Sequence, residues 1–103
     1  MIARIWRGAT RSEDAEEYAA YIERTGLAEY SAVPGNAGAW LLWREVGDEA
    51  EFIALSFWES EEAIRGFAGD DISRAVFYPE DDRYLTRRES TVEHYRLVSP
   101  GHG

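Results

Sequence analysis

Three side chains of this sequence are candidates for acid–base chemistry: His94, Tyr78 and Arg83. His94 falls in a predicted strand, whereas the second histidine, His102, lies in the last few residues. Histidine titrates near neutral pH, so His94 is the candidate general base. A lone histidine in a strand is more often a hydrogen-bonded structural residue, and that alternative stays open.

Tyr78 and Arg83 belong to a polar connection around the sequence PEDDR. As a lid over a pocket, this connection would present the Tyr78 phenol as a donor and the Arg83 guanidinium to an enolate or carboxylate. The alternative is a solvated loop with helix-capping acids. The acids in or near it are Asp70, Asp71, Glu80, Asp81 and Asp82. They lack the spacing of an EF-hand or a His–carboxylate site, so we expect no metal.

Aromatic residues make up 14% of the 103 residues, with four Trp and six Tyr. The absence of Cys excludes disulfides and Cys-ligated metals, and the nucleophile-elbow, P-loop and dinucleotide-binding motifs are missing. An aromatic-rich pocket with few ionisable groups suits a flat apolar ligand. Without a cofactor, a substrate that reacts with dioxygen must itself supply the electrons as a stabilised carbanion. The protein would then remove a proton, through His94 or a water, and hold the anion among Trp58, Tyr78 and Arg83 in a dry cavity.

Hydrophobic periodicity predicts the elements that must position these side chains. The predicted strands cover residues 1–8, 37–45, 51–58 and 91–98. A first helix is predicted over residues 12–24, with Thr10 and Glu13 as a capping box and Thr25-Gly26 as an interruption.

Capping and turn residues mark the second half of the chain. Gly47-Asp48 predicts a hairpin turn, Ser60 caps a second helix, and Gly69 ends it. Asp71 is expected to cap a further short helical piece that Pro79 ends.

The order strand, helix, strand, strand, helix, strand predicts an α+β fold, the ferredoxin-like split βαβ sandwich with a four-stranded antiparallel sheet. Two helices can cover one face of such a sheet. The predicted strands carry apolar residues on both faces, so a second subunit is expected to cover the other face. We therefore predict a homodimer that pairs through its sheet faces.

Length and charge limit the remaining possibilities. A chain of 103 residues predicts a single domain, here residues 1–98, with residues 99–103 as a flexible tail. The net charge of −9 disfavours nucleic acid and anionic membranes as partners. The N-terminal sequence does not have the form of a signal peptide and no apolar run is long enough to span a bilayer, so a cytoplasmic location is expected.

The stretch SFWESEEAIRGFAGDD, residues 56–71, places a Trp at a strand end before an acidic, helix-capping segment and an apolar helical stripe. Together with PGNAGAWLL, residues 34–42, it resembles the antibiotic biosynthesis monooxygenase family, dimeric α/β-barrel proteins of ferredoxin-like fold. The resemblance implies a small pocket between the sheet and the helices, with Trp58 facing a ligand as well as packing. We expect Trp6, Phe67 and Trp40 to line the same pocket.

The family includes oxygenases of aromatic polyketides that need no metal or flavin, haem-degrading proteins and quinol oxidases. The resemblance thus implies a monooxygenase-like protein that acts on a small aromatic or quinone-like molecule without a cofactor. The alternative is a non-catalytic, ligand-binding or stress-related dimer. Haem binding is less expected. The haem-degrading branch carries an Asn on its first strand, where Trp6 or a neighbour stands here, and an axial His after its second helix, where residues 72–78 contain none.

Overall fold

The computed structural model of the chain describes residues 1–98, and the predicted tail lies outside the described residues. Its antiparallel sheet contains β1 (Ile2–Arg11), β2 (Asn36–Val46), β3 (Glu49–Trp58), β4 (Leu85–Arg88) and β5 (Glu93–Arg96). The order is β2-β3-β1-β4, and β5 also pairs with β1. β5 pairs with the start of β1 and β4 with its end, so the two together fill the place of the predicted last strand. The predicted ferredoxin-like α+β fold is confirmed, with five strands instead of four.

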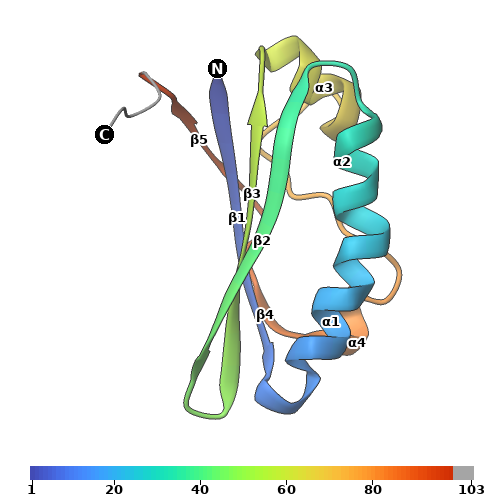
Figure 1. The fold of residues 1–103 in the computed structure, drawn as a ribbon, viewed down its shortest axis with the longest axis vertical. Helices are drawn as coiled ribbons and strands as arrows, with labels where there is room; N and C mark the ends of the chain where they lie inside the picture. The colour runs from blue at the N-terminus through green and yellow to red at the C-terminus, as the bar shows by residue number, and fades with distance from the viewer. Residues whose placement is uncertain (99–103) are drawn as a thin grey trace.

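The helices lie on one face of this sheet (Figure 1). They are η1 (Ser12–Asp14), α1 (Ala15–Ile22), η2 (Glu23–Leu27), α2 (Ala28–Ala32), α3 (Glu61–Ala68) and α4 (Asp81–Tyr84). The predicted break at Thr25-Gly26 is wrong, because the chain continues from α1 into α2 through the π-helical turn η2, where Thr25 Oγ1 donates to the Tyr21 carbonyl at 2.7 Å. The predicted capping box is also wrong, since Thr10 is buried in β1 and donates to the Arg11 carbonyl.

The local signals around the second helix are confirmed. Ser60 Oγ accepts a hydrogen bond from the Ala63 amide at 3.1 Å, and Gly69 ends α3 with a φ of 87°. The predicted helical piece after Asp71 does not form. Instead, Asp71 Oδ1 accepts from the Ser73 amide in a turn. Residues 69–80 form a covering segment that leads from α3 to α4 on the helical side of the sheet (Figure 1).

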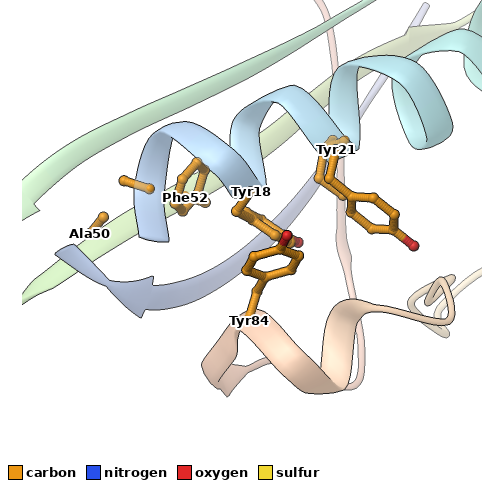
Figure 2. Packing of buried hydrophobic residues seen from close by; sticks show 7 residues of the cluster. Tyr18, Tyr21, Ala50, Phe52 and Tyr84 are labelled. Carbon is orange, nitrogen blue, oxygen red and sulfur yellow. The ribbon is translucent and has the colours of Figure 1, made fainter. Parts of the chain in front are cut away.

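The core lies between β3 and the helices because the residues of β3 alternate in burial. The buried residues are Ala50, Phe52, Ala54, Ser56 and Trp58. Tyr18 of α1 packs edge-on against Phe52, with ring centroids 5.0 Å apart, and Tyr84 of α4 packs against Tyr18 at 5.6 Å (Figure 2). This aromatic cluster fixes α1 and α4 over the sheet.

The opposite face of the sheet carries apolar side chains that no element within residues 1–98 covers. Trp40, Leu42 and Tyr95 are 52%, 47% and 51% exposed, and the alternate residues of β3, Ile53, Leu55 and Phe57, are partly buried beside them. We call this surface the open sheet face. It is the surface that the predicted homodimer would use. Within residues 1–98, none of the helices combines the length and the apolar composition that crossing a membrane requires.

Candidate functional site

A small cavity lies between the helical face of the sheet and the covering segment, and we call it the sheet–helix cavity. Its volume is about 30 Å³. Polar and aromatic lining residues come from β1, α1, α2, the covering segment and α4: Arg4, Trp6, Tyr18, Tyr30, Phe77, Tyr78 and Asp81. A water needs roughly 10–15 Å³ of such cavity volume, so the cavity has room for about two waters.

Arg4 is a buried cation beside this cavity. Its residue is 3% exposed, and its guanidinium donates to the carbonyls of Ile72 at 2.6 Å and Arg74 at 3.0 Å. It also lies over the ring of Phe67, 5.8 Å from the centroid. Burial lowers the pKa of Arg4, which the nearby Tyr30 phenol partly opposes. Arg4 therefore fixes the covering segment on the sheet and brings positive charge to the cavity.

His94 of β5 stands directly opposite Arg4 in the strand register. Arg4 Nη1 lies 3.1 Å from His94 Nε2, and a guanidinium can only donate, so Nε2 is the acceptor. Burial, and then the charge of Arg4, lower the pKa of His94. The structure thus places a neutral His94 next to Arg4 and outside the cavity lining. The lone pair of Nε2 points at the guanidinium and is engaged by it.

Tyr78 lines the cavity, but its hydroxyl donates to Glu29 Oε2 at 2.7 Å on α2. Burial, and then this contact with Glu29, raise the pKa of the Tyr78 phenol. Arg83 lies elsewhere. It is exposed on α4, pairs with Glu80 at 3.5 Å and lies over the Tyr84 ring. The structure therefore brings Tyr78 to the cavity and leaves Arg83 at the surface.

Trp58 is fully buried and its indole N–H donates to Ser56 Oγ at 2.8 Å. It stacks on Phe67, with centroids 5.8 Å apart, and meets Tyr30 edge-on. Neither Trp58 nor Phe67 lines the cavity. Instead, Trp58 packs against Tyr30 and Phe67 packs against Arg4, and both of these contacted residues line it.

The other two tryptophans predicted to bind a ligand lie on opposite sides of the sheet. Trp6 lines the cavity, where its indole N–H donates to the Glu89 carbonyl at 2.8 Å and Phe77 packs edge-on against its ring. Trp40 packs against Phe57 on the open sheet face. The sheet therefore separates Trp40 from the cavity.

Asp81 is a lining residue, although its place in an acidic stretch predicts only helix capping and surface charge. It is 3% exposed, and Oδ2 accepts from the Tyr78 amide at 2.6 Å. Burial raises the pKa of Asp81, against the opposing effects of the Tyr78 amide, the charge of Arg88 and a hydrogen bond from the Tyr18 hydroxyl to the carboxyl. No local pattern separates Asp81 from the exposed Asp82. The sequence does indicate Arg4 as a candidate, because it is a charged residue in an otherwise apolar strand and lies on the same face as Trp6.

Residues 1–77 match the family described as antibiotic biosynthesis monooxygenase. The chain belongs to this family. No protein of curated function matches it. The family match covers β1, β2, β3 and α3, and it ends before Tyr78, so it includes Arg4 and Trp6 but not Asp81.

Solved structures of antibiotic biosynthesis monooxygenase type share the fold. A putative monooxygenase of the family from Bacillus cereus has a TM-score of 0.68 at 14% identity, covering 99% of this chain and 97% of that one. A second, from Nitrosomonas europaea, has a TM-score of 0.68 at 11% identity, covering 96% and 100%. The haem degrader MhuD from Mycobacterium tuberculosis, solved with two haems in its active site, has a TM-score of 0.66 at 18% identity, covering 99% and 100%.

Haem does not fit the cavity of this antibiotic biosynthesis monooxygenase chain. No histidine lines it among the described residues, and His94 Nε2 accepts from Arg4. Arg4 also ties the carbonyls of Ile72 and Arg74 down over the sheet. Residues 72–78 of the covering segment contain no histidine.

Proposed function

We propose that this protein binds a small aromatic or quinone-like molecule in the sheet–helix cavity and acts as a cofactor-independent, monooxygenase-like enzyme. One observation carries the proposal: an aromatic cavity that is lined by a buried cation, Arg4, and a buried carboxyl group, that of Asp81. Ligand sites combine apolar walls with a few placed polar groups. Membership of the antibiotic biosynthesis monooxygenase family supports the reaction class.

Ligand binding requires the cavity to open. Pockets for small molecules commonly measure about 300–1,000 Å³, whereas this cavity measures about 30 Å³. The covering segment is the proposed gate. It contains no helix or regular strand, and Phe77 on it is 39% exposed while its ring touches Trp6. An outward turn of Phe77 and Tyr78 would open the space between Trp6 and Tyr30.

Arg4 and His94 supply the proposed chemistry once a ligand is present. A carbonyl or phenol oxygen of the still protonated substrate would draw the guanidinium of Arg4 toward itself, since hydrogen bonds from a buried cation to an oxygen acceptor are strong. That movement would release His94 Nε2, which now accepts from Arg4. The released imidazole is the proposed general base, and the anion it generates would be the electron donor for dioxygen.

The second candidate is a non-catalytic ligand-binding protein. The small cavity and the engagement of His94 Nε2 by Arg4 favour it, because in this structure His94 has no access to a ligand in the cavity. In that case the cavity would open to bind the ligand, and no oxygen would be consumed.

The two candidates are separated by following tryptophan fluorescence and oxygen uptake while anthrone-type and quinol-type compounds are added. We expect saturable quenching with oxygen uptake in the wild type, and loss of uptake with retained quenching in His94→Gln. Glu93→Gln is the matched control, since Glu93 lies next to His94 on β5 and points to the other face. Quenching without oxygen uptake would support the binding protein, and no quenching by any compound would overturn both candidates.

We also propose that two copies pair through the open sheet face. Exposed Trp40, Leu42 and Tyr95 support this assembly, because large apolar side chains gathered on one face of a monomer mark an interaction surface. The pairing would cover the second face of the sheet and leave the sheet–helix cavity of each copy on the outer, helical side.

A further inference from the structure

The first part of the covering segment is held to the sheet by hydrogen bonds. Arg4 donates to the carbonyls of Ile72 and Arg74 at 2.6 and 3.0 Å. The Ala75 amide donates to the Ser90 carbonyl at 2.9 Å, in the connection between β4 and β5. Residues 72–75 are therefore fixed both by a buried side chain of β1 and by the backbone of a neighbouring loop.

The segment is held again at Tyr78, whose amide donates to Asp81 Oδ2 at 2.6 Å and whose hydroxyl donates to Glu29 Oε2 at 2.7 Å. Between these two attachments, the backbone groups of Val76 and Phe77 form no hydrogen bond within the part of the chain that the structure describes. Both side chains line the sheet–helix cavity. The cavity wall thus contains one short stretch that can move without breaking a backbone hydrogen bond.

Side-chain contacts hold Phe77 in this stretch. Its ring meets Trp6 edge-on, with centroids 6.3 Å apart, and the guanidinium of Arg88 on β4 lies 4.7 Å from its centroid. Arg88 is in turn ion-paired with Asp82 of α4. A guanidinium over an aromatic ring is attracted to it, and the ion pair keeps the guanidinium in place. Since Phe77 is 39% exposed, packing holds it less firmly than it holds a core residue.

We propose that Arg88 is the latch of the sheet–helix cavity. Its contact with Phe77, supported by the ion pair with Asp82, keeps the cavity closed, and loss of this contact lets Phe77 turn into solvent. This inference rests on the proposed ligand site and concerns the control of entry to it. The hydrogen bonds of Arg4 and Tyr78 are kept during the movement, so the polar groups of the cavity stay in place while its entrance opens.

The test measures how often the cavity opens when no ligand is present. Because the sequence contains no Cys, Ile22→Cys introduces a single thiol at a cavity-lining position that is 7% exposed. Iodoacetamide reaches this thiol only when the cavity opens. In the Ile22→Cys protein, Arg88→Gln should raise the labelling rate about two- to fivefold, the range expected for loss of an exposed cation–π contact. Arg87→Gln is the matched control and should leave the rate unchanged, since Arg87 lies on the open sheet face and pairs with Glu49 at 2.9 Å.

Asp82→Asn is a second variant, because it changes an exposed side chain and keeps the charge of Arg88 beside the buried Asp81 carboxyl. It should raise the labelling rate by a smaller factor than Arg88→Gln, and it decides the question if Arg88→Gln fails to fold. An unchanged rate in the folded variants would overturn the inference.

Low concentrations of urea separate opening of the cavity from unfolding, because unfolding exposes far more surface. A labelling rate that rises steeply with urea would show that the thiol is reached by unfolding, which would also overturn the inference. Accelerated labelling that depends little on urea would support the latch even if no aromatic compound quenches the fluorescence. A failed ligand site is thereby told apart from a failed latch.

Discussion

At the scale of single residues, the hydrogen bond from the Trp58 indole to Ser56 Oγ allows the energy of a buried hydrogen bond to be measured apart from that of apolar packing. Ser56→Ala removes the acceptor at 2.8 Å and leaves a fully buried indole N–H without a partner. We expect a loss of about 1–3 kcal/mol in unfolding free energy, measured by urea denaturation. Ser56→Ala in a Trp58→Phe background should cost much less, because no donor remains. Equal losses in both backgrounds would show that the hydrogen bond contributes nothing.

His94 should also make the free energy of unfolding depend on pH. Its pKa is lowered in the folded protein, by burial and then by Arg4, so folding favours the neutral imidazole. A lowered pKa gives stability that is present above the unfolded-state pKa, about 6.5, and is lost as pH falls through the folded value. We expect the stability difference between wild type and His94→Gln to shrink as pH falls from about 7.5 to about 5.5. A difference that is constant or grows over this range would contradict the neutral His94.

At the scale of elements, two glycines predict opposite effects of the same substitution. Gly26 lies in the turn η2, where an added Cβ would stand 3.5 Å from the Tyr78 ring, an ordinary contact. Gly26→Ala should raise stability by about 0.5–1 kcal/mol, since alanine loses less backbone entropy in a helix. Because Gly26 lines the cavity, the same change should weaken ligand binding.

Gly35, in the turn before β2, gives the contrasting case. Its φ is 91°, and an added Cβ would lie 2.5 Å from the Cβ of Ala63 on α3. Gly35→Ala should lower the free energy of unfolding by more than about 1 kcal/mol, because the cost of a positive φ in alanine and the cost of the clash with Ala63 add together. Thermal unfolding of both variants checks the pair, and stabilisation by Gly35→Ala would mean that the turn before β2 adopts another conformation.

At the scale of the whole molecule, the open sheet face decides the state of association. Leu42→Asp places a charge among its apolar residues, where Leu42 is 47% exposed, and should convert the proposed dimer to a monomer at micromolar concentration. Ala20→Asp adds the same charge to an exposed position of α1 and should leave the dimer intact. Sedimentation velocity reads out both variants. If the wild type sediments as a monomer at this concentration, the proposed dimer is wrong.

The sequence by itself determined the first three strands, the hairpin at Gly47, and the start and end of α3 at Ser60 and Gly69. These features depend on alternation, turn conformation and capping, which act within a few residues. The same locality explains its errors. The helical signal of α1 and α2 outweighed Thr25-Gly26, and the short α4 and β4 were hidden in a polar stretch because distant aromatic contacts stabilise them.

The tertiary structure alone decided which side chains share the cavity. Sequence patterns placed aromatic residues on both faces of the strands, but strand pairing and helix packing assigned Trp6 to the cavity and Trp40 to the open sheet face. Asp81 and Asp82 are chemically identical neighbours, and only the packing of α4 under Tyr18 buried one and left the other in solvent. Burial depends on contacts between residues far apart in the chain, and those contacts are fixed only when the whole sheet and its helices have come together.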